Sequence, residues 1–255
     1  MSKIIACYKW VADEADIRIN PDQSVDITKA KGKISDYDKN AIEAAVEAAG
    51  KLGGQAVTLT FGNAGAKPSI KDALSRGPEE AYWVKAAEAD QADGAVTARA
   101  LAAAIQKIGD SSLVICAEGA SDTYARQIAP RIGAILNLPV ISSVIIMTFE
   151  GNSLVATRKL EDSLETVKVE LPAVVAVLPE ANNPPLPGLK AVMAAGKKPL
   201  TEYSAADLGI DFKPRNQVVA VKGYVMNRKN IIFDAGDSVS RVKELAAALR
   251  KEGVL

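Results

Sequence analysis

Strand-like and helix-like segments alternate along the first 147 residues, and no other feature of the sequence constrains the fold as much. Short apolar runs predict strands at residues 3–11, 55–61, 81–85, 113–117 and 139–147. Helical spacing of apolar residues predicts helices between them, at residues 39–52, 69–75, 93–108 and 123–136. Such an alternation builds right-handed βαβ crossovers, so we predict an α/β fold with a mostly parallel sheet and helices on both faces.

The next segment adds a hairpin and a proline-rich loop. Residues 154–160 and 165–171 are short strand-like runs joined by a turn, and residues 173–178 predict a strand buried on both faces. Three prolines in the four positions 184–187 prevent the chain from extending the sheet there. A short helix is expected at residues 188–195. Leu186, the apolar residue among these prolines, is either tucked inward or presented to a partner on a stiff exposed loop.

The character of the chain changes after residue 200. We predict an α/β domain at residues 1–200 and a carboxyl-terminal arm at residues 201–255. The arm contains a strand-like run at residues 218–221 and an amphipathic helix at residues 237–251. The apolar face of this helix, formed by Val242, Leu245, Ala246 and Leu249, requires a surface to cover. That surface lies either on the domain itself or, as we favour, on another subunit.

Composition excludes several classes of function. Basic and acidic side chains number 31 each, so no electrostatic docking on nucleic acid or membrane is expected. The chain has no histidine, which rules out Ser-His-Asp and Cys-His catalysis and histidine-bearing zinc sites. Cys7 and Cys116 end apolar runs and are expected to be buried thiols of a reducing compartment. No apolar run approaches membrane-spanning length and a strand begins at Lys3, so a cytoplasmic protein without direct membrane insertion is expected. We predict no catalytic residue and no metal ligand.

Ligands of α/β sheets bind at the carboxyl ends of the strands. Two predicted turns lie at such strand ends. The turn at Gly62 and Asn63 follows the second strand, and its glycines either are plain turn residues or expose backbone N–H groups to an adenosine or a phosphate. The small residues around Gly119 follow the fourth strand and lead into the helix predicted from Thr123, with Ser121 or Asp122 as its cap. This helix start is an anion site by geometry, and Gln127 is expected in its second turn.

The chain as a whole resembles the β subunit of electron transfer flavoproteins, most closely the FixA branch. The resemblance covers nearly the whole chain and is weakest after residue 200. It is carried by KIIACYKWV at residues 3–11, KISDYDKNAIEAA at 33–45, DALSRGPEEAYWV at 72–84 and SDTYARQIAPRIGAILNLPV at 121–140. The most specific region is VATRKLEDSLETVKVELPAVVAV at residues 155–177, followed by LPGLKAVMAAGKKPL at 186–200.

This resemblance implies a Rossmann-like, adenine-nucleotide-binding sheet and a heterodimer with an electron transfer flavoprotein α subunit. It implies FAD that is shared with or held by the α subunit, and either AMP or a second FAD in this subunit. The cofactor-binding positions that it implies are Cys7, Lys9, Ser35, Tyr37, Phe61, Gly62, Asn63, Gly119, Asp122, Thr123, Ala125, Arg126 and Gln127. Among these, Tyr37 would approach the flavin of the α subunit. Leu186, with Pro187, would dock an acyl-CoA dehydrogenase or a related flavoprotein.

The chain departs from the family pattern at two places. It has Ser35-Asp36-Tyr37 where Asn-Pro-Phe is frequent, and Tyr124 and Arg126 are larger than the residues usual there. The function that we predict is electron carriage rather than enzymatic turnover, with flavin-based electron bifurcation left open. The alternatives are a structural module that binds an adenine nucleotide and a nucleotide-hydrolysing enzyme on a similar fold.

Overall fold

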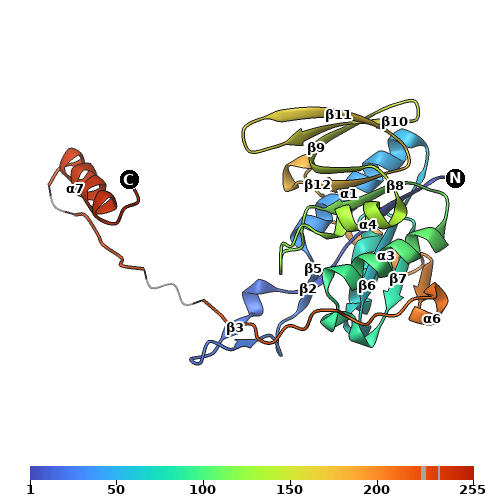
Figure 1. Ribbon diagram of the computed structural model, residues 1–255, viewed down its shortest axis with the longest axis horizontal. Helices are drawn as coiled ribbons and strands as arrows, with labels where there is room; N and C mark the ends of the chain where they lie inside the picture. Colours follow the sequence, from blue (N-terminus) through green and yellow to red (C-terminus); the bar gives the residue numbers. More distant parts are fainter. Residues whose placement is uncertain (225–227, 235) are drawn as a thin grey trace.

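A nine-stranded sheet forms the centre of the molecule in the computed structural model, which describes residues 1–224, 228–234 and 236–255 (Figure 1). Its strand order is β11-β10-β9-β12-β8-β1-β6-β7-β13. These strands are β1 (Lys3–Cys7), β6 (Gln55–Gly62), β7 (Glu80–Lys85), β8 (Ser111–Ala117), β9 (Val140–Glu150), β10 (Ser153–Lys159), β11 (Leu164–Glu170), β12 (Ala173–Val177) and β13 (Leu200–Tyr203). The helices are α1 (Asp36–Leu52), α2 (Lys67–Ser75), α3 (Gly94–Ile108), α4 (Ile128–Leu136), α5 (Leu189–Ala195), α6 (Ala205–Leu208) and α7 (Ser238–Lys251).

The central strands of this sheet are parallel, as the alternation of strands and helices predicts. β1 pairs in parallel with both β6 and β8, and β12 pairs in parallel with both β8 and β9. The hairpin strands β10 and β11 are antiparallel and extend one edge of the sheet. The predicted α/β class and the predicted hairpin are therefore confirmed, and the sheet is Rossmann-like.

Two apolar cores cover the two faces of the sheet, and β1 contributes to both. Ile4 and Ala6 point toward α1, where they join Ile42 in one core. Ile5 and Cys7 point the other way, toward α3 and α4, and belong to the second core. This alternation is the period-two pattern of a strand between two helical layers. The residues of β12 are all buried, which confirms the strand predicted to be buried on both faces.

The first predicted strand, residues 3–11, is wrong in its length. β1 ends at Cys7, and a separate short strand, β2 (Trp10–Ala12), pairs antiparallel with β5 (Gly32–Ile34). The chain turns at Lys9, whose backbone N–H donates to the carboxylate of Asp38 at 2.8 Å rather than to a neighbouring strand. A further pair of two-residue strands, β3 (Arg18–Ile19) and β4 (Val25–Asp26), lies between β2 and β5.

The helix predicted at residues 123–136 is also wrong, because α4 begins only at Ile128. A helix starting at Thr123 would place Pro130 in its interior, where the ring removes a hydrogen bond and clashes with the carbonyl of residue 126. Starting at Ile128 puts Pro130 in the first turn, where its missing N–H costs nothing. The preceding residues Tyr124 and Arg126 have left-handed backbone conformations, with φ of 45° and 55°. Gln127 is consequently the residue before the helix rather than part of its second turn.

The segment after residue 200 begins on the sheet. β13 pairs in parallel with β7, and Phe212 is buried against Phe61 with ring centroids 5.1 Å apart. Residues 218–221, all within the described chain, form no strand, so that part of the prediction is wrong. α7 confirms the predicted amphipathic helix, with Asp237 accepting the backbone N–H of Ser240 at its start. Figure 1 shows α7 well apart from the sheet.

Candidate functional site

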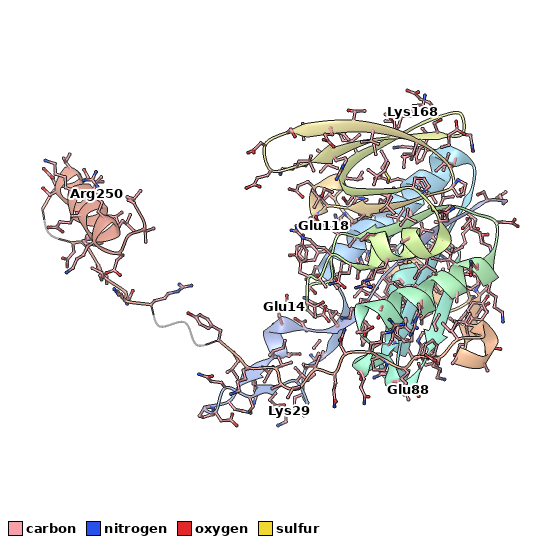
Figure 2. All side chains as sticks on the ribbon, in the orientation of Figure 1. Glu14, Lys29, Glu88, Glu118, Lys168 and Arg250 are labelled. Atoms are coloured by element: carbon pink, nitrogen blue, oxygen red, sulfur yellow. The ribbon has the colours of Figure 1, made fainter. Side chains whose placement is uncertain are left out.

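The candidate site lies where β1, β6 and β8 end, because these neighbouring parallel strands release their following turns at the same edge of the sheet. Lys9 follows β1, Asn63 follows β6 and the turn from Glu118 to Asp122 follows β8. The structure therefore brings together three segments, of which the first and the third are more than 100 residues apart in the sequence. Figure 2 shows Glu118 at the margin of the body, between the hairpin above it and the Glu14 segment below it.

Lys9 and Asp122 connect the first and third of these segments. The Lys9 ammonium forms a hydrogen-bonded ion pair with the Asp122 carboxylate, and both side chains remain partly exposed. Asp122 also accepts the backbone N–H of Thr123 at 2.8 Å. An exposed ion pair of this kind contributes little to stability, so both groups are available to exchange partners with a polar ligand.

Ser35 is fully buried between α1 and the turn after β8. It precedes α1 as its N-cap residue, but its side chain makes no capping hydrogen bond. Its hydroxyl oxygen instead accepts the backbone N–H of Ser121 at 3.1 Å, and its own N–H donates to the carbonyl of Lys9 at 3.0 Å. Ser35 therefore fixes the relative position of the turns after β1 and β8.

A cluster of two tilted aromatic rings and a guanidinium forms one wall of the site. The rings of Tyr37 and Tyr124 lie 5.2 Å apart, and the guanidinium of Arg126 lies 4.8 Å from the Tyr124 ring. The Tyr124 hydroxyl donates to the Glu118 carboxylate at 2.9 Å, and Arg126 lies 3.6 Å from the same carboxylate. Burial, followed by the hydrogen bond to Glu118, raises the pKa of Tyr124 above its usual value. The left-handed backbone at Tyr124 and Arg126 brings both side chains to this wall.

Gly119 lies against Tyr124, and the space between them has no room for a side chain at position 119. A Cβ atom there would meet the Tyr124 ring at 2.8 Å and the Tyr124 Cα at 3.1 Å. The glycine is thus required for the close approach of the turn to Tyr124.

The end of β6 supplies amide groups from the opposite side. The Asn63 side chain accepts the N–H of Gly65 at 2.7 Å and donates to Asp90 at 2.5 Å. The carbonyl of Gly62 accepts the indole N–H of Trp83 at 3.1 Å, and a Cβ at Gly62 would meet the Ala66 methyl at 2.8 Å. Gly62 is accordingly required by packing as well as by the turn.

The remaining predicted residues occupy less defined positions. Gln127 accepts two hydrogen bonds from Arg131, at 3.0 and 3.2 Å, through its side-chain oxygen. Ala125 lies between the two left-handed residues, and Thr123 lies beside Asp122. Cys7 points into the core beside Cys116 rather than toward the strand ends, and both thiols are buried as expected. The Cys7 contact and burial raise the pKa of the Cys116 thiol.

Sequence reasoning missed Asp38 and Glu118. Asp38 is buried in the first turn of α1, beneath Lys9, and desolvation raises its pKa to about 7 against the lowering effect of the Lys9 N–H. Glu118 holds Tyr124 and Arg126, and it also accepts from Ser143 at 3.4 Å. The sequence gives no signal for a role of Asp38 in the site, because acidic residues are common in the first turn of a helix. Glu118 directly follows β8, a position that is itself a signal for a site residue.

Leu186 lies far outside the core, on the loop that follows β12. Its exposed fraction is 91 %, and those of Leu189 and Met193 are 77 % and 68 %. Leu189 and Met193 are four residues apart on α5 and share one face of that helix. Pro187 is half-buried beside them. The inward placement of Leu186 is thus excluded, and the three exposed side chains form what we call the apolar loop surface.

One groove on the surface lies away from the strand ends. This groove, of about 260 Å³, runs between α3 and α4, and its lining includes Arg99, Arg131 and Ile135 but none of the predicted site residues.

The strand ends carry side chains of the kinds that could hold an adenine nucleotide. Lys9 and Arg126 supply positive charge for phosphate groups, Asn63 and Gln127 supply amides for polar edges of a base or ribose, and Tyr37 offers an aromatic face. Within the described residues, no group of three or more histidine, cysteine or acidic side chains is arranged to hold a metal ion. No helix of the described chain has both the length and the apolar character needed to cross a bilayer.

Together, the parallel sheet and the turns gathered at its strand ends define a Rossmann-like α/β protein. The family model for the electron transfer flavoprotein domain matches residues 24–208, which is most of the chain. The protein belongs to the electron transfer flavoprotein family.

Proposed function

We propose that this protein is the β subunit of a heterodimeric electron transfer flavoprotein, closest to the FixA branch. In this role it pairs with an α subunit and carries electrons between an acyl-CoA dehydrogenase-type flavoprotein and other redox proteins. The flavin supplies the redox chemistry when bound, and the protein supplies position and electrostatics. The observation that carries the proposal is the apolar loop surface of Leu186, Leu189 and Met193, which suits transient docking of another protein.

The strand-end site is proposed to hold AMP or a second FAD. Lys9, Arg126 and the turn before α4 would bind the phosphate groups, and Asn63 and Gln127 would bind the polar edges of the nucleotide. Tyr37, whose ring lies 5.2 Å from that of Tyr124, would face the flavin shared with the α subunit. The remaining predicted contacts at Ser35, Phe61, Gly62, Gly119, Asp122, Thr123 and Ala125 belong to the same proposal. At Cys7 the proposal concerns the backbone alone, because the thiol points into the core.

The arm is proposed to pack on the α subunit. The apolar face of α7 is uncovered, with Val242 64 % and Leu245 45 % exposed. An amphipathic helix gains most of its stability by covering its apolar face, so α7 requires a partner surface. The separation of α7 from the sheet in Figure 1 favours a surface on another chain.

Co-purification with the α subunit, followed by quantitation of released nucleotides, tests the proposal. One FAD and one AMP per heterodimer would identify a single-flavin carrier, whereas two FAD would place a redox flavin in this chain and favour bifurcation. A correctly assembled pair without flavin would contradict the proposal.

Docking is tested with Leu186→Ala in the assembled heterodimer, using an acyl-CoA dehydrogenase reduced by its acyl-CoA substrate as the donor. We expect the KM for the dehydrogenase to rise about 5–30-fold, with bound flavin unchanged, because truncation of a central apolar contact costs about 1–2 kcal/mol of binding. Leu164→Ala is the matched control, since Leu164 is 65 % exposed but lies on the hairpin. Equal KM values for the two variants would contradict docking through the loop.

A further inference from the structure

Two asparagines join the start of the docking loop to α1. The side-chain nitrogen of Asn40, in α1, donates to the carbonyl of Pro179 at 3.0 Å and to the carbonyl of Asn182 at 2.9 Å. It also lies 3.0 Å from the side-chain oxygen of Asn182, whose own amide nitrogen donates back to the carbonyl of Asn40 at 3.0 Å. We infer that Asn40 is a positioning residue for docking, because this reciprocal amide pair sets where the apolar loop surface stands.

The amide pair is costly to break. Asn40 is 7 % exposed, and its amide is the described partner of two backbone carbonyls of the segment after β12. Removing the amide leaves these partly buried carbonyls without a donor, which costs more than an ordinary exposed hydrogen bond contributes. The segment would then leave α1 to regain hydrogen bonds with water.

Leu186 follows Asn182 by only four positions, so the position of Asn182 limits where Leu186 can lie. Prolines at 184 and 185 restrict φ along the link, and Pro187 follows Leu186 directly. Within the described chain, no hydrogen bond ties residues 183–187 to the body. The placement of Leu186 therefore depends on the anchors at the two ends of the loop.

The far anchor is separate and lies beyond α5. Ala195 is buried with Ile70 and Leu74 of α2, and the ammonium of Lys198 donates to the carbonyls of Leu74 and Pro78 at 2.9 and 2.6 Å. Because this anchor holds α5 independently, loss of the amide pair should free the loop at one end only. The folded domain should remain intact.

An ion pair touches the same segment but cannot replace the amide pair. Lys159 lies 2.9 Å from Glu180, and both side chains are about half exposed, at 52 % and 53 %. Exposed pairs contribute little to stability. Lys159→Gln is therefore a matched control that removes a contact of this segment without disturbing the buried amides.

The inference rests on the proposed docking function, and its test uses the assembled heterodimer with the reduced acyl-CoA dehydrogenase as probe. We expect Asn40→Ala to raise the KM for the dehydrogenase about 5–10-fold while kcat and nucleotide content stay unchanged, since only the docking contact is misplaced. Amide hydrogen exchange across residues 179–189 should accelerate in the same variant. Lys159→Gln should match the unmodified protein in both measurements.

Asn182→Ala provides a second route that leaves α1 unaltered, and it keeps the inference testable if Asn40→Ala does not fold. Asn182→Ala removes the side-chain contacts of the pair but keeps the Asn40 hydrogen bonds to the carbonyls of Pro179 and Asn182, so its effect on the KM should be the smaller one. The double variant should be no worse than Asn40→Ala alone. When Asn40→Ala is combined with Leu186→Ala, the KM for the dehydrogenase should rise by less than about 2-fold beyond that of Leu186→Ala alone.

Faster exchange with an unchanged KM in the asparagine variants, or full additivity with Leu186→Ala, would overturn the positioning role alone. An unchanged KM in Leu186→Ala itself would overturn the docking function and the inference with it.

Discussion

The carboxylate of Asp38 lies beneath the backbone of Lys9 and accepts its N–H at 2.8 Å, 29 residues away in sequence. This contact ends the hydrogen-bonding of the first strand and turns the chain toward β2. It also places a buried carboxyl group directly under the Lys9–Asp122 ion pair. One acidic residue thus shapes both the fold and the candidate site.

The buried Asp38 predicts a fall in stability as pH rises. Desolvation raises its pKa to about 7, against about 3.9 in an unfolded chain. The folded state therefore binds more protons than the unfolded state, and the stabilisation is complete below about pH 4 and is lost as pH rises through about 7. Between pH 5 and pH 8 this group should cost about 2 kcal/mol of the free energy of unfolding.

Asp38→Asn isolates this contribution, because its side-chain oxygen can still accept the Lys9 N–H. The measurement is urea unfolding of both proteins at pH 5 and at pH 8. The variant should gain stability relative to the unmodified protein as pH rises across this interval. Parallel pH profiles for the two proteins would show that Asp38 keeps an ordinary pKa.

Lys9→Gln should separate nucleotide binding from stability. The ion pair with Asp122 is partly exposed, so its loss should change the free energy of unfolding by no more than about 0.5 kcal/mol. Loss of the positive charge should nevertheless lower the amount of nucleotide that purifies with the heterodimer, measured after release by chromatography.

The matched control is Lys168→Gln, which removes the ion pair with Glu150 at 2.7 Å on the hairpin. It should leave both stability and nucleotide content unchanged. Equal nucleotide content in the two variants would argue against a role for Lys9 in binding.

Two helical glycines should respond in opposite directions to the same substitution. Gly50, in α1, has no heavy atom within 4 Å of an added Cβ, so Gly50→Ala should stabilise the protein by about 0.5 kcal/mol through helix propensity. Gly133, in α4, has Val140 Cγ2 only 2.0 Å from the added Cβ, so Gly133→Ala should cost about 1–3 kcal/mol. Thermal unfolding of the two variants measures both effects. Stabilisation by both would show that α4 does not pack against β9 as closely as described.

Much of the sheet was predictable because its strands and helices each carry a clear period. β12 is uniformly apolar and α3 has a capping Asp93, so both elements agree with prediction. β13 was not predictable, because Leu200–Tyr203 is short and has no apolar run of its own. Its strand conformation comes from pairing with β7, a contact more than 100 residues away in sequence.

The candidate site was predictable in place but not in detail. Residues that end strands, such as Asn63 and Gly119, mark its position. The late start of α4 depends on Pro130 and on the left-handed backbone at Tyr124, which residue type alone does not favour. The role of Asn40 depends on a loop that follows it by about 140 residues, so no local pattern reports it.

The strand order has a consequence for how the chain acquires its structure. β12 lies between β8 and β9, and β13 covers the outer side of β7, so the sheet is completed only when residue 203 is in place. β8 has an unpaired side until β12 is in place, and β7 has one until β13 is in place. Both pairings join segments that are distant in the sequence, and such contacts slow folding. A truncated chain ending before β12 should therefore aggregate rather than fold, because exposed strand edges pair with other chains.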